Sequence, residues 1–415
     1  MSSGLHLLSG KEFFTTRTVA DALTQFAPAR RTPVERVALG EALGRVPAAS
    51  VASPTSLPGF ARSTVDGYAV RAADTYGASE GIPSYLDLVG SVAMGVPAET
   101  AVDAGQAVTV PTGGVLPDGA DAVVMVEHTT ESMRGSVEVV RPVAPGDGLV
   151  RADEDAAPGD ALVPAGRRLR AQDLALLAAA GIVEVEVHAR PRVAIVSTGD
   201  ELVPASMPDL VPGQVRDATS WALAAMVSGA GGLPDVRGIV ADDASALELV
   251  LRDAVATADL LVVSAGSSVG ARDETAGVVA RLGNPGIWCH GLALRPGKPT
   301  LLAECGGVPV IGLPGNPLSA LVVFRLVGVP LVHRVGGCTV LPAQPTTRAR
   351  LSRQIASAAG RLDVVQVRVT DGVAEPLFGL SALLTVLTRA DGYILVPEDA
   401  TGLDAGTGVE VTLYP

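Results

Sequence analysis

The chain contains, at residues 308–323, the stretch VPVIGLPGNPLSALVV, whose pattern decides the fold. The apolar run 308–313 predicts a buried strand, and the apolar residues after the turn predict a helix. Between them, Gly315 can adopt a positive φ, Asn316 can cap the helix, and Pro317 suits its first position. Such a turn directs free backbone N–H groups beyond the end of the strand, where they can bind an anion. An ordinary strand-to-helix connection would contain the same residues.

The same order of strand, loop and helix occurs three more times upstream. We expect strands at 192–196, 238–240 and 260–263, followed by helices at 217–229, 245–257 and 274–282. Residues 189–335 are therefore predicted to form a doubly wound α/β domain around a parallel sheet. Ligands of such sheets bind beyond the carboxyl ends of the strands.

Short β-patterned runs separated by Gly and Pro turns flank the α/β pattern on both sides. We predict a β-rich inserted domain at 53–151 and a small C-terminal β-barrel at 336–415. The remaining residues, 1–52 together with 152–188, form a predicted N-terminal linker domain. The predicted fold class is therefore multidomain, α/β plus β. Within the linker domain, helices are expected at 11–27 and 169–180.

The 415 residues carry a formal charge of −13. This charge argues against a nucleic-acid surface, which needs clustered Lys and Arg. The N-terminus lacks the features of a secretory signal, and the most apolar segment, 318–332, is too short to span a bilayer. Three cysteines without C-x-x-C spacing favour reduced thiols. We therefore expect a cytoplasmic protein that binds neither nucleic acid nor membranes.

Acidic residues gather at the predicted carboxyl edge of the sheet. Crowded carboxylates repel one another, and a divalent cation is a natural way to keep them ionised. Oxygen ligands with room for water suit Mg²⁺, so we predict a magnesium site from Glu201, Asp242 and Asp243. Helix capping or surface exposure would explain any single acidic residue. The full set is Asp200, Glu201, Asp217, Asp242, Asp243 and Asp273.

Two further loops suit anions. The loop ALRPGKP, residues 293–299, places Arg295 and Lys298 between Pro and Gly residues, where they can grip an oxyanion. A Gly/Ser loop ahead of an expected helix can cradle phosphate through backbone N–H groups, although it matches neither a Walker A motif nor a dinucleotide fingerprint. Its candidate residues are Ser264, Gly266, Ser268 and Gly270.

An ordered set of motifs extends over nearly the whole chain. It comprises LPGFARSTVDGYAV, TGGVLPDGADAVV, VSTGDELV, VSAGSSVG, and ALRPGKP followed by LPGNPLSA. In this order and spacing, the motifs resemble the molybdopterin molybdenumtransferase (MoeA) family, relatives of the gephyrin E domain. The resemblance implies an L-shaped homodimer of four-domain subunits. Its α/β domain resembles molybdopterin adenylyltransferases, and its N-terminal linker domain takes part in dimerisation.

The resemblance also implies a reaction, in which molybdate is inserted into adenylylated molybdopterin with Mg²⁺, releasing AMP and the molybdenum cofactor. Implied protein partners are a molybdopterin adenylyltransferase and the enzymes that receive the cofactor. In that family the site lies between subunits, with Asp66 from one and Glu201 and Asp273 from the other as catalytic residues. Residues implied to bind substrate are Thr112, Asp155, Asp217, Ser264, Gly266, Ser268, Gly270, Arg295, Lys298, Pro314, Gly315, Asn316, Pro317, Arg361 and Ser381.

The chain departs from frequent family residues at four positions. Ala265 replaces a glycine in the phosphate loop, Gly291 a lysine, Thr219 an asparagine and Gln366 an arginine. Introducing lysine at position 291 is expected to strengthen molybdate binding, provided that the backbone there does not need a positive φ. Two other functions stay open: a catalytically weakened paralogue that binds the pterin as a scaffold, and a nucleotide pyrophosphate hydrolase.

Overall fold

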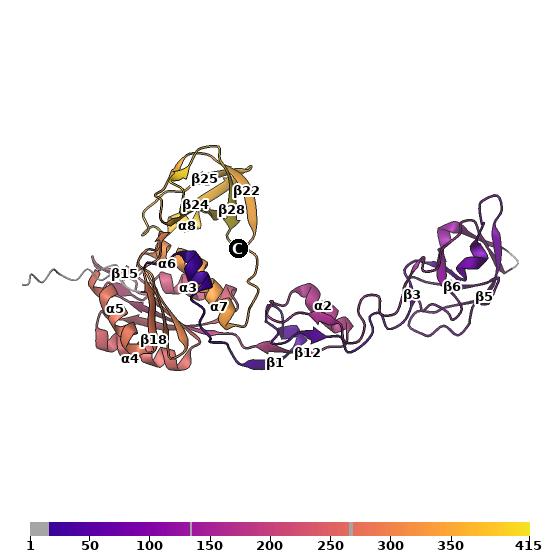
Figure 1. The fold of residues 1–415 in the computed structure, drawn as a ribbon, viewed down its shortest axis with the longest axis horizontal. Coiled ribbons are helices and arrows are strands. Elements are labelled where there is room, and N and C mark those ends of the chain that lie inside the picture. The colour runs from indigo at the N-terminus through magenta and orange to yellow at the C-terminus, as the bar shows by residue number, and fades with distance from the viewer. Residues whose placement is uncertain (1–15, 133–134, 265–268) are drawn as a thin grey trace, which may run out of the picture.

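The computed structural model describes residues 16–132, 135–264 and 269–415, with side chains left undescribed at 132 and 269–273. The chain is elongated (Figure 1). An α/β unit and a β-barrel lie together at one end, a β-rich unit lies at the other, and a narrow segment containing α2 (Ala171–Ala179) joins them. The multidomain α/β plus β class expected from the sequence is confirmed.

The α/β unit is built on a six-stranded sheet in the order β16-β13-β17-β21-β20-β18. The first four strands are parallel, as predicted, but β20 and β18 are antiparallel, so the expectation of a parallel sheet is wrong at this edge. The reason is local, because Gly306 and Gly307 alone join β20 to β21, and both adopt the positive φ of a tight hairpin. The strands are β13 (Arg192–Thr198), β16 (Leu233–Val240), β17 (Leu260–Ser264), β18 (Pro285–His290), β20 (Leu301–Cys305) and β21 (Val308–Leu313).

Helices cover both faces of this sheet because successive strand residues point into two different apolar cores. Val193 and Ile195 of β13 pack in the core that includes α3, α6 and α7, whereas Ala194 and Val196 pack in the core that includes α4 and α5. This is the doubly wound arrangement expected from the sequence. The helices are α3 (Thr219–Gly229), α4 (Ala244–Thr257), α5 (Val269–Leu282), α6 (Pro317–Val323) and α7 (Val329–Val335).

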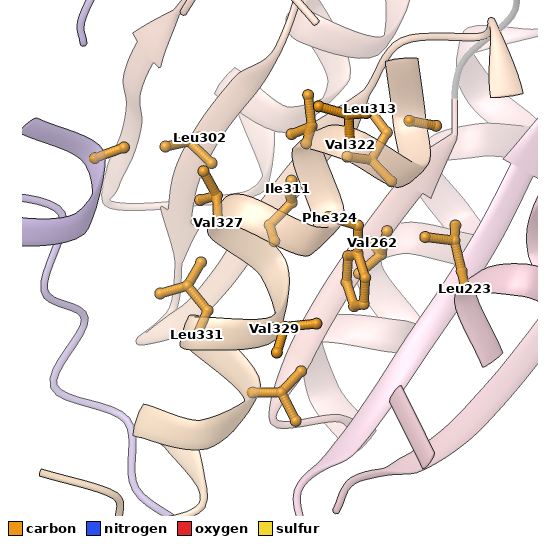
Figure 2. Close-up of a cluster of buried hydrophobic side chains, with 14 of the residues drawn as sticks. Leu223, Val262, Leu302, Ile311, Leu313, Val322, Phe324, Val327, Val329 and Leu331 are labelled. Carbon is orange, nitrogen blue, oxygen red and sulfur yellow. The ribbon is translucent and has the colours of Figure 1, made fainter. Parts of the chain in front are cut away.

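A π-helical segment, Phe324–Gly328, joins α6 to α7 in one continuous helix. Pro330 lies in the first turn of α7, and because it has no N–H to donate, it interrupts the regular hydrogen-bond pattern there. The helix spans residues 317–335, which are 19 residues with a mean hydropathy of 1.7. It is long enough to cross a membrane, whereas the apolar segment expected at 318–332 was judged too short. The helix is nevertheless part of the core, because 72% of its apolar window is buried. Figure 2 shows Phe324 beside side chains of α3 and of the sheet.

The turn before α6 differs from the expectation in two details. Gly315 does not adopt a positive φ. Asn316 occupies the N-cap position of α6, but its side chain makes no capping hydrogen bond, whereas Pro317 begins the helix as predicted. The N–H of Leu318 instead donates to the carbonyl oxygen of Ser381 in the barrel, at 3.1 Å. A carbonyl from another unit thus satisfies a helix N–H that Asn316 was expected to cap.

The β-rich unit contains a six-stranded sheet in the order β7-β4-β6-β5-β9-β8, which includes the strands expected between residues 85 and 150. Its strands are β4 (Gly67–Val70), β5 (Ser84–Ser91), β6 (Gln106–Val110), β7 (Ala122–Met125), β8 (Thr129–Ser132) and β9 (Ser136–Val139). Two-stranded pairs connect this unit to the rest of the chain. They are β1 (Val34–Ala38) with β12 (Glu184–His188), β2 (Val51–Ala52) with β11 (Ala161–Val163), and β3 (Arg62–Ser63) with β10 (Leu149–Val150).

Helix α1 (Val19–Thr24) is shorter than the helix expected at 11–27, of which residues 11–15 lie outside the described part of the chain. Thr18 is the N-cap of this helix and forms a capping box with Asp21. The Thr18 hydroxyl accepts a hydrogen bond from the N–H of Asp21, and the Asp21 carboxylate accepts one from the N–H of Thr18. Val19 and Ala22 then pack into the core of the α/β unit.

The C-terminal unit is a five-stranded barrel, closed because β24 pairs with both β25 and β26. A sixth strand, β19 (Leu294–Arg295), comes from the α/β unit and pairs with β24 in parallel. This pairing fixes the barrel against the loop that precedes β20. The barrel strands are β22 (Thr346–Leu351), β24 (Leu362–Thr370), β25 (Val373–Pro376), β26 (Gly392–Val396) and β28 (Gly408–Leu413).

Candidate functional site

A cavity of about 770 Å³ lies where the α/β unit meets the barrel. Its walls come from the loop after β18, the turn after β21, strand β24 and the barrel loop 377–381. The structure therefore brings together segments that are far apart in the sequence. Six residues predicted to bind substrate line this cavity: Arg295, Lys298, Pro314, Asn316, Arg361 and Ser381.

The walls of the cavity are cationic. Arg295 and Lys298 are exposed and Arg361 is half-buried. Among the described residues that line the cavity, Asp363 is the one carboxylate, so the lining carries a formal charge of three minus one, or +2. In a chain whose net charge is −13, this is a local reversal of sign that favours an anionic ligand.

Gly291 lies in the loop that leads into this cationic wall. It adopts φ +130°, a conformation that lysine rarely takes. Its N–H donates to the carbonyl of Thr300 at 2.7 Å, and its carbonyl accepts from the N–H of Arg17 at 3.1 Å. The condition for a beneficial lysine is therefore not met, and Gly291→Lys is no longer expected to strengthen anion binding.

A second group of predicted residues lies at the carboxyl edge of the sheet. The Thr198 hydroxyl donates to Asp242 Oδ1 at 3.0 Å, and the N–H of Asp242 donates to Asp200 Oδ1 at 3.1 Å. The loops after β13 and β16 are thus tied together. Glu201 is half-buried beside Gly199, where an added methyl group would lie 2.6 Å from Glu201 Oε2.

Two carboxylates at this edge have structural partners. The buried Asp217 accepts from the Ser197 hydroxyl at 2.7 Å and from the Ser220 N–H at 3.1 Å. Asp243 caps α4 by accepting from the Ala246 N–H at 2.7 Å. Both were also explained at the outset as helix caps.

The predicted magnesium ligands do not assemble a metal site by themselves. Among the side chains that the structure describes, at residues 16–131, 135–264 and 274–415, no group of three His, Cys, Asp or Glu is placed to hold a metal ion. Glu201, Asp242 and Asp243 are thus not grouped as a complete metal site in the chain alone, and a magnesium site at these residues stays a prediction. Asp273 belongs to α5, but its side chain is outside the described set.

The phosphate loop falls partly outside the described residues. Ser264 is buried at the end of β17, opposite Leu313 of β21, and Gly270 lies in the first turn of α5. Gly266 and Ser268 are among the residues that the structure does not describe.

Asp66 and Thr112 meet at an exposed corner of the β-rich unit. The N–H and the hydroxyl of Thr112 both donate to Asp66 Oδ1, at 2.7 and 3.0 Å. The backbone hydrogen bond first, and the hydroxyl second, hold the pKa of the Asp66 carboxyl below its ordinary value, because both stabilise the charged form. Asp155 is exposed in a turn of the same part of the chain, where its N–H donates to the carbonyl of Leu57 at 2.9 Å.

One subunit does not bring this corner to the α/β unit. Asp66 follows β3 and Thr112 follows β6, and Figure 1 shows both strands at the far end of the molecule from α4 and α5. The narrow linker segment separates the two ends. Asp66 therefore cannot act with Glu201 of its own chain in this conformation.

Sequence reasoning missed Asp363, which contacts two of the predicted cations. Asp363 Oδ1 accepts from Arg361 Nε at 2.9 Å, and Oδ2 lies 3.4 Å from an Nη of Arg295. The sequence signal was only the spacing: Asp363 follows Arg361 by two residues, and residues two apart in extended chain point to the same face, but no strand was predicted at these positions.

Comparison with known proteins accounts for the whole arrangement. Residues 17–181 match the MoeA N-terminal region (domain I and II), 194–334 match a probable molybdopterin binding domain, and 348–414 match the MoeA C-terminal region (domain IV). A solved structure of a molybdopterin biosynthesis MoeA protein from Pyrococcus horikoshii shares 37% identity and a TM-score of 0.78, covering 96% of this chain and 99% of that one. The fold is thus that of a protein of molybdenum cofactor biosynthesis.

Two relatives with curated names are molybdopterin molybdenumtransferases. A molybdopterin molybdenumtransferase from a Nostoc species is 38% identical over 306 residues, which are 73% of this chain and 70% of the relative. A molybdopterin molybdenumtransferase from Haemophilus influenzae is 30% identical over 386 residues, covering 92% and 94%. The chain belongs to the molybdopterin molybdenumtransferase (MoeA) family.

The Asp66–Thr112 pair gives a prediction about pH. Thr112→Val removes the hydroxyl donor but keeps the backbone N–H, so the pKa of Asp66 should rise toward its ordinary value without reaching it. The Asp66 carboxylate would then be neutralised at a higher pH than in the wild type. A ¹³C NMR titration of the Asp66 carboxyl measures this shift. Thr112→Ser keeps a hydroxyl and serves as the control, and equal Asp66 pKa values in all three proteins would show that the hydroxyl has no influence.

Proposed function

We propose that this protein inserts molybdenum from molybdate into adenylylated molybdopterin and releases AMP and the molybdenum cofactor. The observation that supports this most directly is the cavity lined by Arg295, Lys298 and Arg361. Molybdate is a dianion, and the formal charge of +2 on the lining complements it. Guanidinium groups bind oxyanions through paired N–H donors, and the ammonium group of Lys298 adds a point charge.

The pterin substrate would bind beyond the strand ends and extend into this cavity. Pro314 and Asn316 follow β21 and form part of the wall, and β21 pairs with β17, whose last residue Ser264 opens the phosphate loop. A ligand whose phosphates rest on the loop after β17 would thus have its next atoms beside the cationic wall. Such α/β sheets bind their ligands in the crevice beyond the carboxyl ends of the strands.

Magnesium enters this proposal only together with the substrate. Mg²⁺ is commonly held by one or two carboxylates plus substrate phosphates and water, not by a protein cage. Glu201, Asp242 and Asp243 are the candidates, because Asp242 and Asp243 each use only Oδ1 for a hydrogen bond within the described part of the chain and keep Oδ2 for an ion. The ion would neutralise phosphate charge, and no step of the proposal is derived through it.

We further propose a homodimer in which two chains share each site. Asp66 and Thr112 of one subunit would complete the site at the α/β unit of the other, since the elongated subunit keeps these two regions apart (Figure 1). The hydrogen bonds from Thr112 lower the pKa of Asp66 and so favour its carboxylate form. A molybdopterin adenylyltransferase and cofactor-receiving enzymes remain the proposed protein partners, in the cytoplasm.

Removing Lys298 tests the oxyanion assignment. A charge-assisted contact to an anion contributes about 1–3 kcal/mol, so Lys298→Ala should raise the molybdate concentration for half-maximal AMP release by roughly 5- to 150-fold. Lys298→Arg should keep most of the affinity. Arg348→Ala removes an exposed cation of the barrel that does not line the cavity and should change the molybdate dependence little. An unchanged molybdate dependence in Lys298→Ala would exclude this loop from the oxyanion site.

Mixing two inactive variants tests the shared site. Asp66→Ala and Glu201→Ala homodimers should each lose AMP release, because every site lacks one residue. After subunit exchange, a heterodimer contains up to one site with both residues intact, so activity should return. Native mass spectrometry measures the fraction of heterodimer, and Asp66→Ala exchanged with itself is the control. Complete exchange without recovery would show that Asp66 and Glu201 act within one chain or not at all.

A further inference from the structure

The carboxylate of Asp363 is buried behind the cationic wall of the cavity. Its side chain is 4% exposed, whereas the side chains of Arg295 and Arg361 are 59% and 36% exposed. Asp363 Oδ1 accepts from Arg361 Nε at 2.9 Å, and Oδ2 faces an Nη of Arg295 at 3.4 Å. One hidden carboxylate thus contacts two cations that remain open to the cavity.

The three residues come from two units of the fold. Arg361 and Asp363 belong to the barrel, two residues apart, so they lie on the same face of β24 and its N-terminal extension. Arg295 belongs to β19 of the α/β unit and lies directly opposite Asp363 in the parallel pairing of β19 with β24. The N–H of Leu362 also donates to the carbonyl of Ala293 at 2.8 Å. Asp363 is therefore at the seam through which the barrel docks onto the α/β unit.

The contacts leave most donors of both arginines available. A guanidinium group has five N–H donors, and Asp363 contacts only Nε of Arg361 and one Nη of Arg295. Both Nη groups of Arg361 have no partner in the part of the chain that the structure describes. That pair of nitrogens forms the fork that binds oxyanions in a bidentate manner.

We propose that Asp363 is a positioning residue for oxyanion binding: it holds Arg295 and Arg361 in place and makes the anion site depend on docking of the barrel. The inference rests on the proposed function and extends it to a carboxylate that acts through two arginines and not as a ligand of the anion. The effect of Asp363 on anion affinity would have the opposite sign in a simpler alternative, in which Asp363 only neutralises surplus positive charge. A neutralising carboxylate weakens anion binding, whereas a positioning carboxylate strengthens it.

Titration with molybdate alone separates the two roles. Asp363→Asn raises the formal charge of the lining from +2 to +3, yet we expect it to weaken binding by roughly tenfold, because the arginines lose their common anchor. Asp363→Glu keeps the charge but shifts the anchor by one methylene, and should also weaken binding. Isothermal titration calorimetry of the full-length protein measures both. Tighter binding by Asp363→Asn, or wild-type binding by Asp363→Glu, would overturn the proposal.

A double-mutant cycle adds a readout that a general structural role would not move. If Asp363 acts through Arg361, then Asp363→Asn should cost much less affinity in an Arg361→Ala background than in the wild type. Additive losses would contradict the proposal. Asp391→Asn is the matched control, because Asp391 lies in the same barrel and its carboxylate accepts, among the described residues, only the N–H of Val369 at 2.8 Å. It should leave molybdate affinity unchanged.

The proposal also has a test that needs no anion. The rate at which phenylglyoxal modifies Arg361, followed by mass spectrometry of its peptide, should rise in Asp363→Asn and stay at the wild-type value in Asp391→Asn. If the wild type does not bind molybdate, the oxyanion assignment under the proposed function is refuted. The rate of Arg361 modification would still show whether Asp363 holds Arg361. Equal rates in all three proteins would overturn the positioning role.

Discussion

The pairing of β19 with β24 is the interaction on which the candidate site depends. It joins a two-residue strand of the α/β unit to the longest strand of the barrel, and it is supported by a shared apolar core. Val364 and Tyr393 of the barrel are buried in the same cluster as Phe324 and Ile311 of the α/β unit. Fully burying one such side chain contributes about 1.5–3 kcal/mol, so the two units are held together by more than the strand pairing. The cavity is consequently a fixed feature between two packed units.

Electrostatics gives this cavity its chemical character. The chain has 44 acidic and 31 basic residues, and Lys298 is one of two lysines, with Lys11, in the whole sequence. Positive charge is therefore local, and at the cavity it comes from two segments that only the folded chain brings together. The carboxyl edge of the sheet is acidic instead, and its carboxylates Asp200, Asp242 and Asp243 accept hydrogen bonds from other residues of the protein.

The sequence predicted most of the fold because its signals were local. Glycine and proline turns and apolar runs predicted segments that overlap β13, β16, β17 and β21 and the helices that follow them, whereas β18 and β20 were not predicted. The antiparallel edge was missed although Gly306 and Gly307 are a hairpin signal, since the parallel pattern upstream was extended over it. For the site, Arg295 and Lys298 were visible in one motif. Their proximity to Arg361 came from family resemblance, and Asp363 was missed because a contact across 68 residues is set by docking of two units.

Under the proposed function, the cationic cavity between the α/β unit and the barrel is the oxyanion site. Tungstate has the shape and charge of molybdate and scatters X-rays anomalously, so crystals of the protein soaked in tungstate locate the site directly. We expect an anomalous peak within contact distance of Lys298 and the Arg361 guanidinium group, and loss of that peak in Lys298→Ala crystals. A peak elsewhere with an empty cavity, or a peak that Lys298→Ala leaves unchanged, would contradict it.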